Sequence, residues 1–587
     1  MLHLTVFLIF SFAALAGGII VYIGKYDENT IYIPVSVFVS ALPFAVGGFH
    51  SYTVFPICIY SVFLLLKINR INSERQISVR LTLPVAASAV LLVSSALTCF
   101  FAVDRGLAPY GLMRSAAIFL FTAAVSGLSD ENRKKSFRFV PATAAAMTAA
   151  TFIMSLFGGL REYLVVAERL GGTFEYPNAY SGYLLIALAL SIGKKDRSWF
   201  DLVIDAALIF GVFESGSRTA FIILPAMLAA FLIFSKEKKA AAADLCILAV
   251  GAASAVVVYA VRHDISYAVS RFTEISLSSS TFVGRILYWK DALPAILKHP
   301  FGLGYMGYYY MQGSFQTGVY SVAFVHNGAL QILLDYGFLP FIAYAASSVA
   351  AFTSKRRSAA EKIALGVLLL HSLFDFDLEF LSICVIGSLM LEYREIKIVK
   401  IKKAVCLSAV GVVSAAALWT SAADALYRSD LASASLAVYP FNTSALIDKL
   451  IEADDVGREN DIALKILPLN GRVPVAYSAR ANYFFSRGDT VKAAEYKEKA
   501  IECNRYSLDE YLDYITKLYQ AMMVYDDSGD ASGTLFCVKK IVSAADMLTE
   551  LKERTSPLAY KIKDKPRLDL PDEYRELVET LRPYIAD

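Results

Sequence analysis

The chain has 587 residues, of which 56% are hydrophobic and only 19% are charged, and its formal net charge is +3. Soluble proteins typically carry about 25% charged residues, so this composition argues against an ordinary soluble enzyme. Apolar runs with few or no charges cover residues 1–24, 81–103, 140–157 and 240–260. Because roughly 18 such residues are enough to cross a bilayer as a helix, the sequence predicts an all-α, polytopic membrane helix bundle.

Clusters of Lys and Arg separate the apolar runs and set the expected orientation. They fall at residues 67–80, 133–138, 194–197, 236–239, 355–357 and 394–403. By the positive-inside rule these loops are cytoplasmic, so the alternate loops face outward. This parity predicts about 14 spans of ordinary length.

Two features of the first apolar segments affect this parity. The first run lacks a basic leader and a clear cleavage site, so we expect it to be retained as a span. The stretch 31–66 is too long for one helix, and Pro43, Gly47 and Gly48 are expected to break it. The predicted membrane domain covers residues 1–420, with a large outer loop at 261–325.

The pattern changes from Ser421 onward, where apolar residues recur at helical spacing among charged ones. We therefore predict a separate helical domain at 421–587, which is extracytoplasmic because one last span follows the cytoplasmic cluster at 394–403. Residues 477–501 read as a helix, a Gly-Asp turn and a second helix. This pair resembles a tetratricopeptide unit, and a generic helical bundle is the alternative.

Two smaller features of this tail allow more than one interpretation. If the tail is extracytoplasmic, Cys503 and Cys537 could form a disulfide, with free buried thiols as the alternative. Residues 526–530, Asp-Asp-Ser-Gly-Asp, look like a calcium loop but lack its closing Glu. We therefore expect a solvated turn there.

Polar residues from distant parts of the chain gather at the loops predicted to face outward. These candidates are Arg169, Asn178, Ser217, Arg218, Arg285, His326, Asn327, His371 and Asp375. Ionisable residues at membrane spans are functional hypotheses by default, although one Arg at a span end is usually only a membrane-interface anchor. The small residues around Arg218, Gly216 and Ser217, leave room for a ligand.

Arginine and histidine in this setting suit a lipid-linked diphosphate, whose anionic group lies at headgroup depth. Arg is permanently charged and binds phosphate oxygens through paired hydrogen bonds. A neutral His can take a proton from an incoming hydroxyl group. The arginines would also stabilise the charge that develops on the diphosphate as it leaves.

Two motifs in the same region suggest other chemistry. Residues 302–307 fit the dinucleotide-binding fingerprint but lack the strand–helix–strand context, so we expect only a tight turn. Asp375-Phe-Asp377 fits the Asp-x-Asp pattern of metal-dependent sugar transfer. The alternative is that Asp375 and His371 support the site through hydrogen bonds.

Taken together, the motifs resemble the O-antigen ligase/polymerase family of membrane proteins. The matching pieces lie between residues 169 and 379 and are Arg169…Gly172…Pro177-Asn178, Gly216-Ser-Arg218-Thr-Ala, Gly284-Arg285…Trp289, Pro300-Phe-Gly-Leu-Gly304 and Val325-His-Asn327…Leu330-Gln…Asp335-Tyr-Gly337. Members of this family transfer undecaprenyl-diphosphate-linked glycans outside the membrane and are similar to the GT-C glycosyltransferases. The resemblance implies that Arg218 and Arg285 contact the diphosphate and that His326 activates the acceptor hydroxyl.

The resemblance also implies an inverting, metal-independent glycosyltransferase in a bacterial plasma membrane, which counts against a metal at Asp375-Phe-Asp377. The expected partners are a polyprenyl-diphosphate-linked glycan, a glycan or lipid acceptor, the lipid bilayer and a protein bound by the tail; neither a cofactor nor a nucleic acid is expected. Ligase and polymerase activities both fit. Alternative functions are a transporter or flippase of lipid-linked glycan, which would show two related halves, and a non-enzymatic membrane scaffold.

Overall fold

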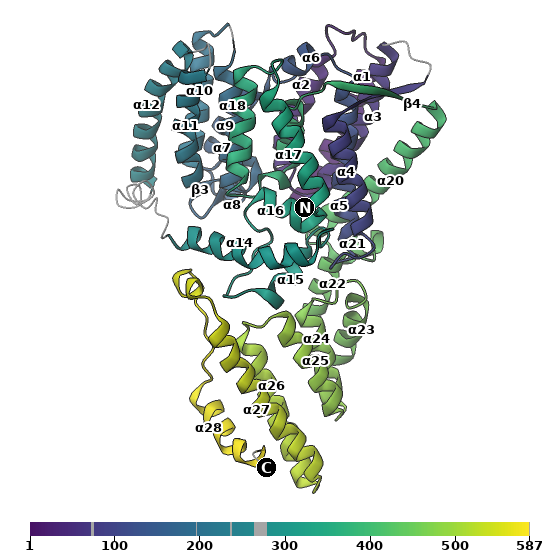
Figure 1. The fold of residues 1–587 in the computed structure, drawn as a ribbon, viewed down its shortest axis with the longest axis vertical. Coiled ribbons are helices and arrows are strands. Elements are labelled where there is room, and N and C mark those ends of the chain that lie inside the picture. Colours follow the sequence, from purple (N-terminus) through teal and green to yellow (C-terminus); the bar gives the residue numbers. More distant parts are fainter. Residues whose placement is uncertain (72–75, 195, 235–237, 263–278, 586–587) are drawn as a thin grey trace. The chain divides into compact units, whose positions relative to one another are not determined.

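Helices make up 75% of the computed structural model, and the described strands form two sheets of two strands each (Figure 1). The structure describes residues 1–71, 76–194, 196–234, 238–262 and 279–585. Part of the expected outer loop, residues 263–278, therefore lies outside the described residues. The prediction of an all-α helix bundle is confirmed.

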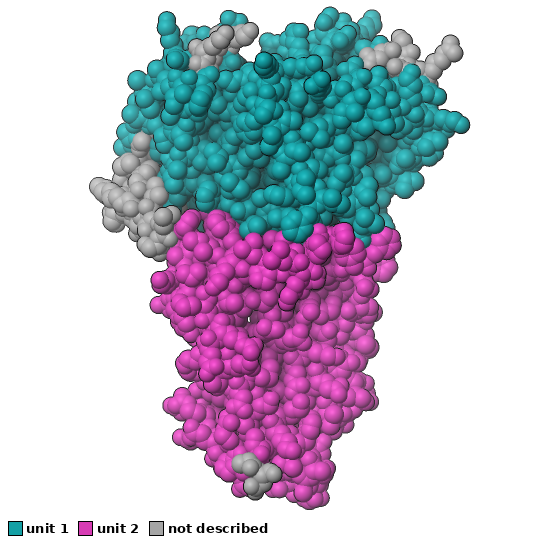
Figure 2. All heavy atoms as spheres, in the orientation of Figure 1, with its two compact units in different colours: residues 1–98, 109–275, 326–431 teal, residues 99–108, 276–325, 432–587 magenta. Residues whose placement is uncertain are grey.

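The chain divides into two compact units (Figure 2). The first comprises residues 1–98, 109–275 and 326–431, and the second comprises residues 99–108, 276–325 and 432–587. Helix α20 (Lys403–Arg428) continues past Thr420, where the sequence pattern changes, and the units separate after it. Most of the expected outer loop, from residue 276 onward, groups with the tail.

The first unit is built around the buried helix α9 (Pro177–Ile192), which packs against α7, α10, α11 and α18 (Figure 1). Nearly all of its side chains are buried, as expected for a helix that is apolar on every side. The other helices of the unit are α1 (Leu2–Ile23), α2 (Tyr32–Ala41), α3 (Val54–Ile71), α4 (Leu83–Thr98), α5 (Ala108–Ser126), α6 (Asp130–Lys135), α7 (Val140–Met154), α8 (Gly158–Leu164), α10 (Trp199–Glu214), α11 (Arg218–Phe234), α12 (Lys238–Arg262), α16 (Gly328–Tyr336), α17 (Phe338–Thr353), α18 (Ala359–Ser372), α19 (Leu381–Leu389) and α20.

Several of these helices match membrane spans in length and composition. Among the described residues, five helices are long and apolar enough to cross a membrane, and they are Leu2–Ile23, Ser51–Ile71, Ala108–Ser126, Asp130–Met154 and Lys403–Arg428. Further apolar helices of 10–17 residues accompany them. These helices support a multi-pass membrane protein, while the expected number of about 14 spans stays a prediction.

The predicted break in residues 31–66 is confirmed. Helix α2 ends at Ala41, and three short 3₁₀ helices, η1 (Leu42–Phe44), η2 (Val46–Gly48) and η3 (Ser51–Thr53), lead into α3. Gly47 has φ +61°, which glycine adopts without steric cost. A Cβ atom on Gly47 would lie 2.4 Å from Cδ1 of Phe174, so this glycine also lets the loop approach η4 (Gly172–Phe174).

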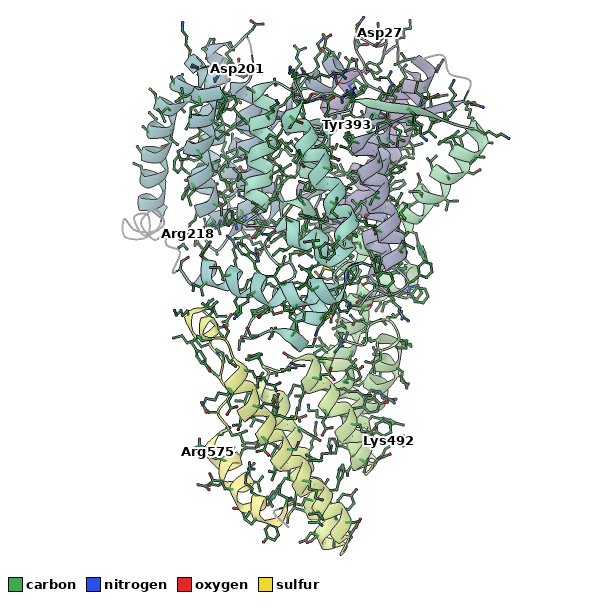
Figure 3. All side chains as sticks on the ribbon, in the orientation of Figure 1. Asp27, Asp201, Arg218, Tyr393, Lys492 and Arg575 are labelled. Atoms are coloured by element: carbon green, nitrogen blue, oxygen red, sulfur yellow. The ribbon has the colours of Figure 1, made fainter. Side chains whose placement is uncertain are left out.

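Two basic loops that the sequence assigns to one membrane side lie together in the structure. Strand β1 (Ile77–Thr82) pairs antiparallel with β4 (Glu395–Ile401), which joins the loops at 67–80 and 394–403. Arg218 lies at the end of the bundle opposite to Asp27 and Asp201 (Figure 3). The arrangement fits the predicted parity, and the assignment of one end to the outside stays a prediction.

The second unit is also helical. It contains α14 (Ser280–Lys298), α15 (Gly307–Phe315), α21 (Ala432–Val438), α22 (Thr443–Ile451), α23 (Val456–Ile466), α24 (Pro474–Ser486), α25 (Thr490–Cys503), α26 (Leu508–Asp527), α27 (Ala531–Arg554) and α28 (Asp572–Leu581). The predicted helix–turn–helix is α24 and α25, where Gly488 has φ +74° and the Asp489 side chain accepts the Lys492 amide at 3.2 Å. Its assignment as a tetratricopeptide unit stays a prediction.

The smaller expectations for the tail can be compared with this unit directly. Both Cys503 and Cys537 are buried free thiols, so the disulfide is not formed. Of residues 526–530, the first two end α26 and the next two form a turn. Asp530 then caps α27 by accepting the amides of Ser532 and Gly533, each at 3.1 Å. In the motif at 302–307, Gly302 and Gly304 have positive φ values, as the predicted tight turn requires.

A buried carboxylate, Asp104, organises the segment 99–108 within the second unit. It accepts hydrogen bonds from the Leu107 amide at 2.7 Å, Thr443 Oγ1 at 2.9 Å and Asn470 Nδ2 at 2.8 Å. Burial raises the pKa of the Asp104 carboxyl to about 6, because removing a carboxylate from water disfavours its charged form. This segment connects α4 to α5, so its fold links the tail to the chain of the first unit.

We predict that the raised pKa of Asp104 makes the second unit less stable as the pH rises from 4 to 7. Over this window the unfolded chain loses the proton first, which lowers the free energy of unfolding by at most about 3 kcal/mol. Asp104→Asn, which stays uncharged, should remove this contribution, whereas Asn at the exposed Asp526 should not. The free energy of unfolding is measured at each pH from Trp289 fluorescence during denaturation, in a background lacking Trp199 and Trp419. The same pH dependence of this free energy in wild type and Asp104→Asn would contradict the prediction.

Candidate active site

His326 lies immediately before helix α16 in a strained backbone conformation. Its φ is +53°, a left-handed value that non-glycine residues adopt rarely and mostly at functional positions. The next residue, Asn327, fixes this turn on both sides. Its Oδ1 caps α16 by accepting the Leu330 amide at 3.0 Å, and its Nδ2 donates to the Leu373 carbonyl at 3.0 Å.

The His326 ring faces a buried carboxylate. Nδ1 of His326 lies 3.3 Å from Oδ1 of Asp375, and the exposed fractions of these side chains are 21% and 1%. Asp375 also accepts hydrogen bonds from the Tyr176 hydroxyl at 2.9 Å, Asn178 Nδ2 at 2.6 Å and the Phe376 amide at 3.0 Å. The carboxylate is therefore held from several sides and can orient the imidazole, while the ring remains partly accessible.

Arg169 connects this network to the turn before Arg218. Its Nη2 donates to Oδ1 of Asn178, and its Nε donates to the Ser215 carbonyl at 2.7 Å. In that turn Gly216 has φ +56° and the Ser217 hydroxyl accepts the Ala220 amide at 3.4 Å, so that α11 begins at Arg218. The structure thus brings together four of the predicted site residues, Arg169, Asn178, His326 and Asp375. The residues that precede Arg218 are bound to the same hydrogen-bond network through Arg169.

A second histidine–aspartate pair lies deeper in the first unit. Nδ1 of His371 is 2.6 Å from Oδ2 of Asp377, and both side chains are almost completely buried. The two carboxylates of the Asp-Phe-Asp motif therefore face different histidines. These contacts fit the alternative interpretation, in which His371 and Asp375 support the site through hydrogen bonds, and that role stays a prediction.

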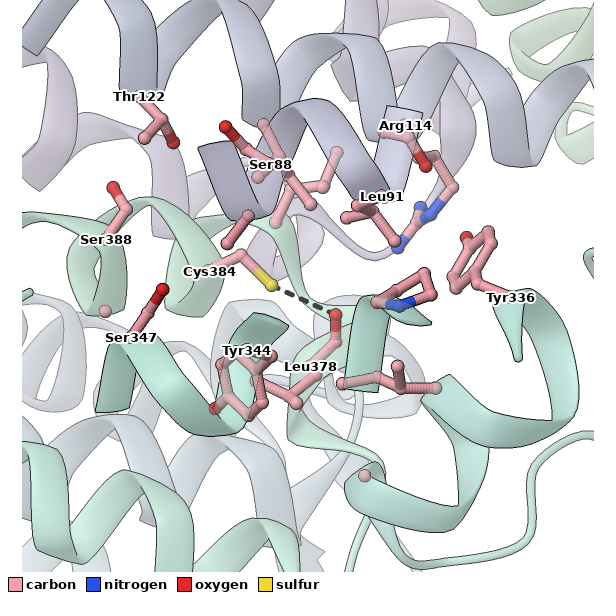
Figure 4. Close-up of a pocket in the computed structure, with 18 of the residues that line it drawn as sticks. Ser88, Leu91, Arg114, Thr122, Tyr336, Tyr344, Ser347, Leu378, Cys384 and Ser388 are labelled. Atoms are coloured by element: carbon pink, nitrogen blue, oxygen red, sulfur yellow. Dashed lines mark hydrogen bonds between the residues drawn. The ribbon is translucent and has the colours of Figure 1, made fainter. Parts of the chain in front are cut away.

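Phe376, between the two carboxylates, covers the site and lines a neighbouring cavity. Its ring stacks on Tyr176 with centroids 4.6 Å apart and meets the His326 ring edge-on at 5.2 Å. The cavity has a volume of about 150 Å³, and its walls are mostly apolar side chains, with contributions from α4, α5, α16, α17, α18 and α19 (Figure 4). Gly328, two residues after His326, also lines it.

One end of this cavity carries buried polar groups. Arg114 donates from Nη1 to the Phe49 carbonyl at 2.7 Å and lies 3.5 Å from Oε2 of Glu379. Gln331 Nε2 donates to both carboxylate oxygens of Asp335, at 3.1 and 3.0 Å. Figure 4 shows Arg114 and Tyr336 at this end and Thr122, Ser347 and Ser388 at the other.

Sequence reasoning missed two of these contributors. Tyr176 lies inside the motif at 169–178, but nothing in the sequence indicates that its hydroxyl bonds to a residue 199 positions away. Arg114 is not among the residues that the sequence suggested for the site, and α5 carries it into the helix bundle, where it is 3% exposed. A signal existed for Arg114: a charged residue within an otherwise apolar helix is usually paired.

Arg285 belongs to the second unit, on α14. One helical turn later, the Trp289 indole donates to the Val325 carbonyl at 3.1 Å. Val325 directly precedes His326 in the chain, so α14 is bound to the residue that leads into the candidate base.

The central part of the chain is similar to a known protein family. Residues 203–345 match a family model described as O-Antigen ligase. This stretch contains Arg218, Arg285 and His326, so the resemblance inferred from the motifs is confirmed over it. No curated protein matches the chain.

We predict that Arg169→Lys destabilises the first unit, because one ammonium group cannot reproduce the two diverging bonds of the guanidinium. Losing a hydrogen bond to a buried partner costs about 1–3 kcal/mol, which should appear as a lower apparent melting temperature in detergent. The matched control is Arg161→Lys, whose exposed pair with Glu168 contributes about 0–1 kcal/mol. Similar melting temperatures for both variants would show that Arg169 does not hold the network.

Proposed function

We propose that the protein transfers a glycan from a polyprenyl-diphosphate carrier to an acceptor hydroxyl at the outer face of a bacterial plasma membrane. The match to the O-antigen ligase family supports a role in joining surface polysaccharides, as a ligase or a polymerase. The observation that carries the mechanism is the His326–Asp375 pair beside an apolar cavity.

In this mechanism His326 acts as the general base. Its Nδ1 faces Asp375, so Nε2 takes the proton of the acceptor hydroxyl as that oxygen attacks the anomeric carbon. The new carbon–oxygen bond forms while the bond to the diphosphate breaks, and polyprenyl diphosphate leaves with the electron pair. A single displacement of this kind inverts the anomeric configuration. Asp375 stabilises the imidazolium that results, as carboxylates do in other histidine-based sites.

Arg218 is the proposed contact for the diphosphate. The turn at Ser215–Ser217, held by Arg169, fixes where α11 begins, and the first turn of a helix favours anions. Arg285 is the second contact that the family resemblance implies. The Trp289–Val325 hydrogen bond supports this role because it ties the helix of Arg285 to the residue before His326.

The apolar cavity is the proposed place for part of the isoprenoid chain. Its lining is mostly hydrocarbon, and Phe376 separates it from the His326 ring. The Arg114 guanidinium in this cavity already contacts Glu379 and the Phe49 carbonyl, which disfavours a diphosphate there. The headgroup would therefore bind outside the cavity, towards Arg218.

We predict that His326→Ala and Arg218→Ala lose nearly all glycan transfer while the proteins still insert into the membrane. Removal of a general base typically costs about 10²- to 10⁴-fold in rate, and a matched control, His299→Ala on the second unit, should retain activity. Purified protein is incubated with a lipid-linked oligosaccharide, with and without candidate acceptors. Longer glycans indicate a polymerase, and a new conjugate indicates a ligase.

Two outcomes of this assay would contradict the proposal. Full transfer by both variants would remove His326 and Arg218 from the mechanism. Movement of the lipid-linked glycan across liposomes, without any change in glycan length or attachment, would instead favour the transporter.

We also predict that Asp375→Asn lowers kcat by about 10²- to 10⁴-fold with little change in KM, because the carboxylate acts through His326. Tyr176→Phe, which removes one of several donors to Asp375, should lower kcat by less than Asp375→Asn. Tyr163→Phe on α8 is the matched control and should leave kcat unchanged. Steady-state kinetics at varied concentrations of the lipid-linked glycan measure kcat and KM separately. A rise in KM at constant kcat would assign Asp375 to substrate binding.

A further inference from the structure

Three segments of the first unit bring together two histidines and a carboxylate that the transfer mechanism does not use. His3 lies on the first turn of α1, His50 lies between η2 and η3, and Glu175 follows η4. One ring nitrogen of each histidine and one carboxylate oxygen of Glu175 lie within 4.8 Å of one another. The two imidazole rings meet edge-on, with centroids 4.9 Å apart.

The local backbone explains how the three groups meet. Because Gly47 has no side chain, Phe174 packs directly on its loop, and this contact brings His50 towards η4. Glu175 then adopts φ +54°, a left-handed conformation that is unfavourable for a residue with a Cβ atom. Strain of this kind persists where the surrounding structure holds it, and such residues cluster at functional sites, ligand clamps among them.

The hydrogen bonding of the two histidines fits a pair of metal ligands. His50 is 8% exposed, and among the described residues its buried Nδ1 has no hydrogen-bond partner. Buried polar atoms are nearly always paired, so an orphan needs an explanation. The Nδ1 atom of His3, in contrast, has a partner, the Tyr52 hydroxyl at 3.2 Å. The backbone amide of Tyr52 in turn donates to Asp424 at 3.0 Å. Outer partners of this kind orient the imidazoles that bind metals.

We propose that His3, His50 and Glu175 bind a divalent transition-metal ion of the zinc class. Two imidazoles and one carboxylate are a known donor set for zinc with an open fourth position, whereas calcium and magnesium prefer oxygen ligands alone. Ligand atoms around tetrahedral zinc are about 3.3 Å apart, as follows from bond lengths near 2 Å. The triangle of ligand atoms therefore needs to contract by about 1.5 Å at most, which side-chain rotation supplies.

The consequence of such an ion would be positional. Glu175 directly precedes Tyr176, whose hydroxyl donates to Asp375. A metal bound to Glu175 would fix the backbone that presents Tyr176 and Asn178, and so would stabilise the orientation of Asp375. The ion would not take part in the transfer step, and its binding does not depend on the proposed glycan chemistry.

Zinc binding by the full-length protein tests this inference directly. Chelator-treated protein in detergent, with the exposed Cys246 replaced by Ser and without a histidine tag, is titrated with zinc against a chromogenic competitor, and bound metal is counted by mass spectrometry. We expect one zinc ion per chain, with affinity lowered at least about tenfold in His3→Gln, His50→Gln and Glu175→Gln. His299→Gln, the control, should bind zinc like the parent protein.

A melting measurement separates lost binding from lost folding. Zinc should raise the apparent melting temperature of the parent protein and of His299→Gln, because a ligand that binds only the folded state stabilises it. It should leave that of Glu175→Gln unchanged, while the metal-free melting temperatures stay similar. Absence of bound zinc in the parent protein, or equal zinc affinity in all variants, would overturn the inference whether or not the protein transfers glycans.

Discussion

A carboxylate that is 1% exposed, Asp375, must be hydrogen-bonded on all sides, because an unpaired buried charge is strongly destabilising. Its partners come from the start of α9, from the turn before α16 and from its own loop. These elements can satisfy Asp375 only in one relative arrangement. The need to pair this group therefore fixes the position of His326, and with it the orientation of any acceptor that His326 contacts.

Helix α9 is the element that makes this arrangement rigid. It is buried along nearly its whole length among four other helices, and protein interiors of this kind are close-packed. Gly182 on α9 leaves room for His371, since a Cβ there would lie 3.0 Å from the imidazole Nδ1. The same helix thus holds Asn178 towards Asp375 at its start and allows the His371–Asp377 pair one turn later. Both carboxylates of the Asp-Phe-Asp motif depend on it.

The features that could be predicted from the sequence are those encoded locally. The apolar runs predicted the helices, Pro43 and Gly47 predicted the break before α3, and Gly488-Asp489 predicted the turn between α24 and α25. Pairings between distant segments have no such local signal. Neither the hydrogen bond from Tyr176 to Asp375 nor the meeting of His3 and His50 with Glu175 follows from spacing. The packing of the short loop at 99–108 with the tail depends on Asp104 partners more than 300 residues away.

The two arginines of the first unit that the sequence placed at the same membrane face, Arg169 and Arg218, occupy different positions relative to the start of α11. Arg169 gives its Nε and one Nη to the Ser215 carbonyl and to Asn178, so its charge is committed to positioning. Arg218 begins the helix that this contact fixes, at a face where helix amides also favour anions. A phosphate bound there would meet a guanidinium whose place is set by its neighbour. Composition and topology alone cannot reveal the role of Arg169, because only its hydrogen bond to the Ser215 carbonyl shows that it holds the turn before Arg218.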